Sequence, residues 1–300
     1  MAGPLQQLLV ERSPLILDGA MGTELQRRDI DGSLPLWSAK ALMANPAAVL
    51  QIHKDYLDAG ADIITTNTFR TTRRTFQRAK LPDRSLGMTV LAVQLAKEAR
   101  LAHPERRILI AGSMAPLEDC YRPDWVPTDR ELRAEHSEQA YRLAAAGVDC
   151  LLLETIGTIR EAFAACEAAK RTGLEVIVSF LCRTDGALYG GETLRDAVDT
   201  IEPFGPAVFS LNCAPAAHLT GLLKELRSYT ELPSAVYGNV GKPGEEQGPD
   251  FIYDVDPDRY AAYAAEWARL GASIIGGCCG TTPEFIRRMH GRLQGLHPQV

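Results

Sequence analysis

Eight short runs of apolar and β-branched residues recur along the chain, and each run is continuous rather than alternating with polar residues. They lie at residues 15–19, 61–68, 108–114, 148–155, 175–182, 207–213, 234–240 and 272–279. Continuous apolar runs are typical of strands buried on both faces, as in a parallel sheet covered by helices. The chain is therefore expected to build its core from eight buried parallel strands.

Segments with helical start signals separate these runs. Asn45 and Asp256 are each followed by proline, the pairing expected at the N-cap and first position of a helix. Thr128 with Glu131 three residues later has the pattern of a capping box. Helices thus alternate with strands.

This alternation predicts an α/β fold, a single (β/α)8 (TIM-type) barrel that occupies residues 1–300 as one domain. The competing architecture is a doubly wound open sheet. No GxGxxG motif follows the first run, which weighs against the dinucleotide-binding version of that alternative.

Composition and charge exclude several classes of partner. The net charge is −6, so the chain lacks the basic footprint of a protein that binds nucleic acid or anionic lipid. No apolar run approaches the roughly 18 residues of a membrane helix, and the N-terminus does not resemble a signal peptide. Seven cysteines without a disulfide pattern indicate a reducing, cytoplasmic location.

Three of the apolar runs end on cysteine, at Cys182, Cys213 and the Cys278-Cys279 pair. In a closed barrel, the sixth and eighth strands are separated by one neighbour, whereas the fifth lies further round. Cys213, Cys278 and Cys279 are therefore expected to converge above the barrel mouth, where such barrels place their chemistry. For the adjacent Cys278 and Cys279, the alternatives are that both side chains are buried as small apolar groups or that they form a redox disulfide. The remaining cysteines are interpreted as structural: Cys120, Cys150, Cys166 and Cys182.

Three thiolates favour Zn²⁺, and three protein ligands with an open fourth position are typical of catalytic zinc. Such a zinc is electron-rich and polarises carbonyl groups poorly. A thiol that binds there would lose its proton and stay nucleophilic, which suits alkyl transfer to sulfur. The six histidines are dispersed and form no HExxH motif, which argues against a zinc hydrolase.

Six motifs resemble the homocysteine S-methyltransferase family, in family order and over about residues 13 to 290. They are DGAMGTELQRR (18–28), ADIITTNTF (61–69), LLLET (151–155), SLNC (210–213), YGNVG (237–241) and GGCCG (276–280). The resemblance implies a (β/α)8 barrel and zinc held by Cys213, Cys278 and Cys279. It also implies that the homocysteine thiolate is the fourth ligand.

The ammonium and carboxylate of homocysteine need partners of their own. Glu154, which ends an apolar strand, is expected to bind the ammonium, with an ion pair to an arginine as the alternative. Asp18 and Gly19 match the family's first-strand DG near the amino-acid moiety, although Asp18 is equally suited to cap the following helix.

Polar residues at two further strand ends complete the predicted site. Thr66, Asn67 and Thr68 are expected to donate to the carboxylate, with ordinary strand-end capping as the alternative. Asn239 matches the Asn of a Tyr-x-Asn-x-Gly motif and is expected at the fourth zinc position before substrate arrives.

The predicted reaction is zinc-dependent methyl transfer from a sulfonium donor to the homocysteine thiolate, which gives methionine. The donor is expected to be S-methylmethionine or S-adenosylmethionine. Arg70 and Thr155 stand where betaine-using relatives have tyrosines, which disfavours betaine. Residues 118–129, with Tyr121 and Trp125, either cover the donor or pack against the barrel rim.

Several alternatives stay open at this stage. The acceptor is another thiol or a selenol, or the methyl group comes from betaine or from a separate corrinoid protein. An alternative of another class is a non-catalytic subunit that stores or senses zinc. The expected binding partners are two small-molecule substrates, and neither nucleic acid nor a membrane. The chain is also expected to work either alone or as a homo-oligomer.

Overall fold

The computed structural model of the protein describes residues 2–243 and 251–295, and these fold around one eight-stranded parallel sheet. The strand order is β1-β10-β7-β6-β5-β4-β3-β2. A parallel bridge between Leu17 and Ile63 joins the two outer strands, so the sheet closes into a barrel. The strands are β1 (Leu15–Ile16), β2 (Ile63–Thr65), β3 (Leu109–Met114), β4 (Cys150–Ile156), β5 (Glu175–Phe180), β6 (Val208–Pro215), β7 (Ser234–Asn239) and β10 (Ala272–Gly277).

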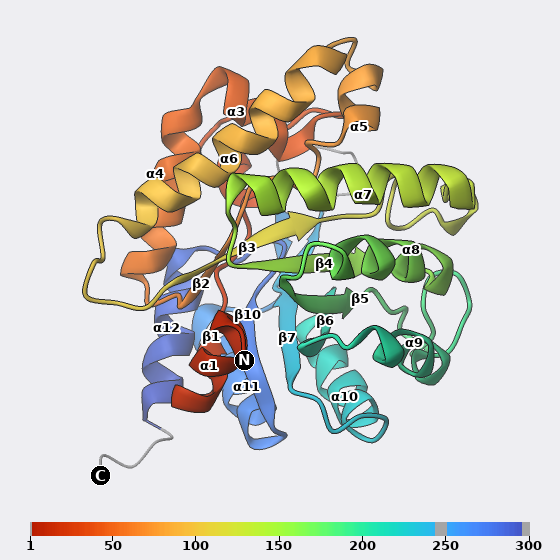
Figure 1. Cartoon of the computed structure of the whole chain (residues 1–300). Helices are drawn as coiled ribbons and strands as arrows, with labels where there is room; N and C mark the ends of the chain where they lie inside the picture. The colour runs from red at the N-terminus through yellow and green to blue at the C-terminus, as the bar shows by residue number, and fades with distance from the viewer. Residues whose placement is uncertain (1, 244–250, 296–300) are drawn as a thin grey trace.

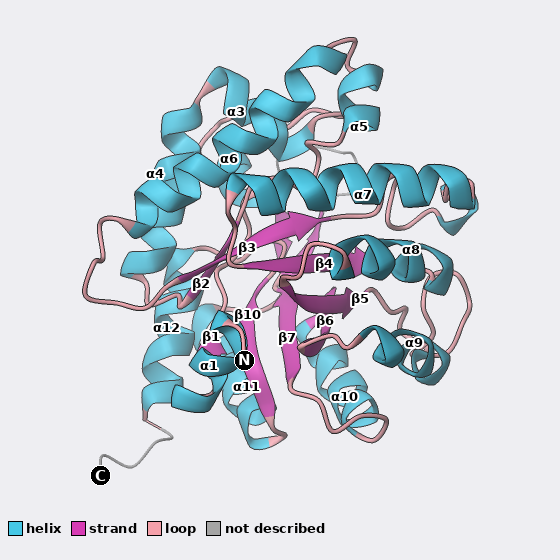
Figure 2. Cartoon of the chain, in the orientation of Figure 1, coloured by secondary structure: helices cyan, strands magenta, loops and turns pink. Residues whose placement is uncertain are grey.

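Each of the eight apolar runs overlaps one of these strands, and the sheet closes, which confirms the predicted (β/α)8 barrel over the open sheet. A short antiparallel pair, β8 (Gly241–Pro243) and β9 (Phe251–Tyr253), follows β7 and was not predicted. Figure 2 shows the strands at the centre of the molecule, with the helices around them.

The helices of the described chain surround the barrel (Figure 1). They are α1 (Pro4–Glu11), α2 (Gly22–Arg27), α3 (Lys40–Ala44), α4 (Pro46–Asp58), α5 (Arg73–Arg78), α6 (Ser85–Arg100), α7 (Asp129–Ala146), α8 (Ile159–Lys170), α9 (Leu194–Ile201), α10 (Ala216–Arg227), α11 (Pro257–Arg269) and α12 (Pro283–Gln294). Short 3-10 turns occur at Trp37–Ala39, Pro82–Arg84, Pro123–Trp125 and Glu202–Phe204. Within the described residues, none of these helices has the length and apolar character needed to cross a bilayer.

The predicted helix starts are confirmed. The Asn45 side chain accepts a hydrogen bond from the backbone of α4, and the Asp256 side chain does the same for α11. Thr128 and Glu131 form a reciprocal capping box at the start of α7. These caps satisfy backbone N–H groups that have no partner within the helix.

Helix α1 covers the amino-terminal end of the barrel. Its Leu5 and Leu8 are buried with the side chains that fill the barrel interior, such as Leu15 and Ile274. The Glu175 carboxylate, at the start of β5, accepts hydrogen bonds from the backbone N–H groups of Leu5 (2.7 Å) and Gln6 (2.9 Å). With this end closed, the opposite mouth is left for chemistry.

At the carboxyl ends of β4 and β6, the strand register shifts and the backbone turns left-handed. Thr155 has φ 62° and Cys213 has φ 57°, which is unfavourable for a residue with a side chain. The buried Asn212 side chain braces this region. Its Oδ1 accepts hydrogen bonds from the Thr155 N–H (3.0 Å) and the Ser179 hydroxyl (2.7 Å), and its Nδ2 donates to Thr155 Oγ1 (2.9 Å). Asn212 thus ties three adjacent strand ends together.

Replacing Asn212 by Ala tests this brace. The substitution leaves buried polar groups without partners, so we expect the free energy of unfolding to fall by about 2–4 kcal/mol in urea titrations. Ser210→Ala is the matched control. Ser210 lies on the same strand, β6, and its buried hydroxyl has no hydrogen-bond partner in the described part of the chain. That control should be as stable as wild type or more stable, because a buried hydroxyl without a partner costs free energy. Equal losses in the two variants would contradict the bracing role.

Candidate active site

Three cysteine sulfurs converge at the barrel mouth, as the sequence predicts. Cys213 lies near the end of β6, and Cys278 and Cys279 directly follow β10. Their sulfurs all lie within 4.8 Å of one another, and Cys213 Sγ is 3.9 Å from Cys279 Sγ. Zinc–sulfur bonds of about 2.3 Å in a tetrahedron place sulfurs about 3.8 Å apart. The spacing therefore fits one tetrahedral metal ion, and the free thiols rule out a disulfide in this structure.

Local backbone contacts aim the Cys278-Cys279 pair at this point. The Cys278 N–H donates to Gly238 O (2.9 Å), which anchors the pair to the end of β7. A Cβ on Gly277 would lie 2.4 Å from Thr281 Oγ1, so only glycine fits there. Gly280 has φ +83°, which supplies the left-handed turn after the two thiols.

The three thiols do not have equal acidity. Hydrogen bonds from Cys278 and Cys279 lower the pKa of Cys213 well below its ordinary value, and burial opposes this only in part. The hydrogen bond with Cys213 raises the pKa of both Cys278 and Cys279. Cys213 is thus the first of the three to ionise, and the cluster holds the other two protons until a cation replaces them.

Two carboxyls with little contact to solvent lie at the same mouth, the buried Asp18 and the partly buried Glu154. Asp18 is only 4% exposed, and burial raises its pKa to about 8, with a further contribution from the charge of Glu154. The backbone N–H (2.7 Å) and hydroxyl (2.9 Å) of Thr65 donate to its carboxylate. Burial raises the pKa of Glu154 to about 7, and the negative charge of Cys213 adds to this rise. The Ser113 hydroxyl donates to Glu154.

The structural alternatives for these two carboxyls do not hold. Asp18 is not a helix cap, because α2 begins at Gly22 and its N-cap residue, Met21, makes no side-chain capping bond. Glu154 forms no ion pair with any residue of the described chain. Asp18 is therefore buried and Glu154 partly buried without a cationic partner, as expected of groups that receive a cation.

Thr66 and Thr68 make strand-end contacts. The Thr68 hydroxyl donates to Ser113 O (2.7 Å), and the Thr66 hydroxyl pairs with that of Thr68 (2.8 Å). The Asn67 Nδ2 donates to Ser38 O (3.0 Å), while its buried Oδ1 has no partner in the described structure. The hydroxyl protons of Thr66 and Thr68 are used internally, which matches the capping alternative, and their predicted contact with substrate stays a prediction.

Gly19 and Asn239 flank the thiol cluster. A Cβ on Gly19 would lie 2.7 Å from the Tyr56 ring, so the close packing of this loop requires glycine. Asn239 Oδ1 accepts a hydrogen bond from the Cys279 N–H (3.1 Å), and its Nδ2 lies 3.9 Å from Cys213 Sγ. In this arrangement Asn239 neighbours the sulfurs through hydrogen bonds, and its role as a zinc ligand stays a prediction.

The segment after β3 reaches over the cluster. The Tyr121 hydroxyl lies 3.3 Å from Cys213 Sγ, and the Tyr121 ring meets the Tyr189 ring edge-on at 5.3 Å. Trp125 is about half exposed and stacks instead with the Arg122 guanidinium, 4.3 Å from its ring centre. Of the two aromatic residues in this segment, Tyr121 therefore lies at the site and Trp125 lies on the rim.

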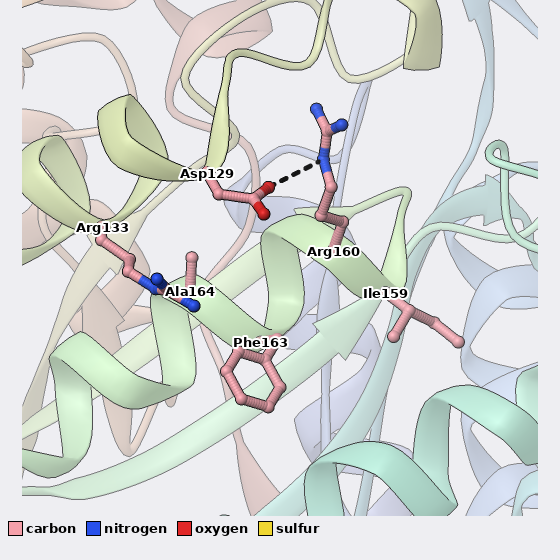
Figure 3. Close-up of a pocket in the computed structure, with 6 residues that line it drawn as sticks. All are labelled: Asp129, Arg133, Ile159, Arg160, Phe163 and Ala164. Carbon is pink, nitrogen blue, oxygen red and sulfur yellow. Dashed lines mark ion pairs between the residues drawn. The ribbon is translucent and has the colours of Figure 1, made fainter.

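A separate hollow lies between the outer helices α7 and α8 (Figure 3). Its lining includes Arg133, Phe163 and an ion pair of Asp129 with Arg160 at 3.6 Å. The lining residues include no cysteine or histidine. It therefore offers none of the soft ligands found at the barrel mouth.

Three residues of the site had no role assigned from the sequence, although Ser113 was expected at a strand end of the barrel mouth. Asn212 precedes Cys213, and an amide inside an apolar strand is a signal that it has a buried partner. Thr281 donates to Cys278 O (2.7 Å) and accepts from the Ala20 N–H (3.1 Å), so it links the cysteine loop to the first strand end. Ser113 interacts with Glu154 across adjacent strands, a contact that requires the register of β3 and β4.

Comparison with known proteins defines the class. The family model described as Homocysteine S-methyltransferase matches residues 15–293. The chain is 32% identical to a homocysteine S-methyltransferase of Bacillus subtilis, YbgG, over 95% of this chain and 96% of the relative. It is 30% identical to the selenocysteine Se-methyltransferase of Brassica oleracea, over 93% of this chain and 88% of that protein. The metallated crystal structure of the homocysteine methyltransferase MmuM from Escherichia coli superposes with a TM-score of 0.85 at 32% identity, covering 97% of this chain and 100% of that one.

Fold, cysteine cluster and these matches together define an enzyme of the barrel methyltransferase class. The chain belongs to the homocysteine S-methyltransferase family.

Replacing Asp18 by Asn tests the electrostatics of the mouth. The folded protein binds the Asp18 proton more tightly than the unfolded chain, where an Asp has a pKa of about 3.9. The contribution of Asp18 to the free energy of unfolding therefore falls as pH rises from about 4 to 8. In Asp18→Asn, we expect the loss between pH 5 and pH 8 to be smaller by about 1–3 kcal/mol, measured by urea unfolding at fixed metal content.

Asp199→Asn serves as the control, because Asp199 is exposed on α9. It should lose as much stability between the two pH values as wild type. An Asp18→Asn protein that follows the wild-type pH dependence would show that Asp18 does not keep its proton in the fold.

Proposed function

We propose that this enzyme transfers a methyl group from a sulfonium donor, S-methylmethionine or S-adenosylmethionine, to the sulfur of homocysteine and forms methionine. The observation that supports this most strongly is the convergence of three thiols on one point beside the carboxyls of Asp18 and Glu154, whose pKa values are raised. The thiols suit a soft metal and a sulfur substrate, and the carboxyls suit the ammonium of an amino acid.

The metal in this proposal is Zn²⁺, held by Cys213, Cys278 and Cys279. The 3.9 Å separation of two of the sulfurs suits zinc–thiolate geometry. When bound, zinc supplies a fourth position at which a thiol loses its proton and remains nucleophilic. Before substrate binds, Asn239 is the side chain proposed for that position, because its amide already lies against Cys213 and Cys279.

The amino-acid part of homocysteine binds beside the thiols. Glu154 and Asp18 accept the ammonium, and its charge lowers the raised pKa of both carboxyls, so that they ionise on binding. The unpartnered Oδ1 of Asn67 is a further acceptor. The substrate carboxylate is assigned to the Gly19 N–H, which makes no hydrogen bond in the described structure.

Thr66 and Thr68 act in this proposal by holding the strand end that presents Asn67. Methyl transfer itself is an in-line displacement. The substrate sulfur forms a bond to the methyl carbon, and the sulfonium sulfur leaves as a neutral thioether with the electrons of the broken bond. No side chain needs to remove a proton at this step, because the attacking sulfur is already ionised.

Substitution of each cluster cysteine tests the metal assignment. Cys213→Ala, Cys278→Ala and Cys279→Ala should each lose stoichiometric zinc and roughly 100-fold or more of the activity, as measured by metal analysis and methionine formation. Cys182→Ala is the control: this strand-end thiol is buried, and burial raises its pKa to about 12. It should keep zinc and activity. A metal-free variant with full activity would contradict the proposal.

A donor and acceptor screen tests the reaction. With homocysteine as acceptor, we expect methionine from S-methylmethionine or S-adenosylmethionine and not from betaine or a methylcorrinoid protein. Selenocysteine is included as a second acceptor, because a 30% identical relative is a selenocysteine Se-methyltransferase. Methyl transfer to selenocysteine alone would replace homocysteine in the proposal. Failure of every pair would favour a zinc-storing or zinc-sensing protein.

Two wider predictions accompany this function. The full chain, residues 1–300, is proposed to be a single domain, and its described parts belong to one barrel. The protein is proposed to work in the cytoplasm, where a reducing environment keeps the three thiols available for metal.

A further inference from the structure

We infer that Tyr121 and Tyr189 form the docking site for the methyl-bearing cation of the donor. This inference rests on the proposed function and extends it, because it assigns a binding site to the second substrate. Both proposed donors carry a positive charge spread over the carbons attached to the sulfonium sulfur, and the acceptor sulfur carries none. Aromatic faces attract such a cation.

The first observation is where Tyr121 lies. Its hydroxyl is 3.3 Å from Cys213 Sγ, so its ring stands directly beside the thiol cluster. Tyr189 meets it at 5.3 Å between ring centres, with the ring planes 69° apart. Two rings at this angle and distance form an edge-to-face corner, which covers one face of one ring and leaves the other electron-rich faces open to a further group.

The second observation is that the fold builds this corner from two loops. Tyr121 follows β3, Tyr189 follows β5, and both loops pack on Gly157 just beyond β4. A Cβ on Gly157 would lie 3.1 Å from Cys120 O and 3.3 Å from Tyr189 Cβ. The Gly190 N–H donates to Gly157 O (2.8 Å), which fixes the Tyr189 loop.

Side-chain contacts hold the Tyr121 loop in place. Arg70 Nη1 donates to Glu118 O (3.0 Å), and the Tyr121 N–H donates to Asp119 Oδ1 (2.9 Å). The ring of Tyr121 is therefore held over the cluster by contacts at its own loop as well as by its neighbour Tyr189.

The third observation is the difference between this pair and Trp125. The Arg122 guanidinium already covers the Trp125 ring at 4.3 Å. Within the described part of the chain, no arginine or lysine lies over the face of Tyr121 or Tyr189. Tyr121, which contacts Cys213, and its neighbour Tyr189 are thus free to receive an external cation.

This placement also explains product release. A sulfonium is positively charged and binds the aromatic corner, whereas the thioether that remains after transfer is neutral. The attraction to the rings ends when the methyl group leaves, so the spent donor dissociates. The neutral thioether of the product methionine gains no such attraction.

The test measures preference for the cation directly. S-methylmethionine and methionine differ by one methyl group and one charge, so the ratio of their dissociation constants reports recognition of the cation. The ratio is measured for the zinc-loaded enzyme without homocysteine, by NMR observation of the S-methyl protons. For wild type, we expect tighter binding of the sulfonium and a ring-current shift of its methyl signals.

Tyr121→Leu and Tyr189→Leu should each reduce the cation preference by about threefold to thirtyfold. Tyr121→Phe keeps the ring and should keep most of the preference. Tyr141→Leu is the matched control, because Tyr141 is an exposed tyrosine on α7. Each variant is used only with wild-type zinc content and a wild-type circular dichroism spectrum, which separates loss of the site from loss of the fold.

The inference is overturned if both leucine variants keep the wild-type preference for S-methylmethionine over methionine. It is also overturned if Tyr121→Phe loses as much as Tyr121→Leu, since the hydroxyl and not the ring would then be responsible. Parallel titrations with S-adenosylmethionine and betaine identify which methylated cation the corner binds best. Because no turnover is needed, a failed methylation assay with an intact preference would refute the proposed function and leave this site standing.

Discussion

Closure of the sheet between Leu17 and Ile63 determines which strand ends face one another at the barrel mouth. The strand order places β6 and β10 on either side of β7, so residues more than sixty positions apart in the chain meet. Cys213 then lies beside Cys278 and Cys279, and β4 and β1 bring Glu154 and Asp18 to the same space. In an open sheet, the first and second strands would be free edges and Asp18 would lie at one of them, bonded to one strand only.

Several acidic groups lie close together at the barrel mouth, and they repel one another when they are ionised. Three thiols and two carboxyls share a poorly solvated space, and the raised pKa values of Asp18 and Glu154 show how they are tolerated there. Apart from Cys213, whose pKa is lowered, these groups bind their protons more tightly than they would in water. A metal ion at the sulfurs and an ammonium at the carboxyls each release those protons and satisfy the charge. Acidic side chains that lie away from solvent without a cationic partner thus suit the site both to a soft metal ion and to the ammonium of an amino acid.

Much of this could be predicted from residue pattern alone. Continuous apolar runs predicted the eight strands. Cys213 ends the sixth strand, which only one strand separates from the eighth, and this spacing predicted its convergence with Cys278 and Cys279. These predictions depend only on strand order and on residues at strand ends. The contacts of Asn212 with Thr155 and Ser179 could not be predicted, because they depend on register shifts and left-handed residues that leave no periodic signal. Tyr121 was singled out by its loop, but its contact with Cys213 depends on how that loop folds across the mouth.

The central claim is that the three thiols leave one position for the sulfur of the substrate. X-ray absorption at the zinc edge tests it most directly when homocysteine is replaced by its selenium analogue, because selenium is distinguishable from protein sulfur. The account predicts three sulfur neighbours at about 2.3 Å in every state and a new selenium neighbour once the analogue is added. A zinc shell that is unchanged at saturating analogue would contradict it.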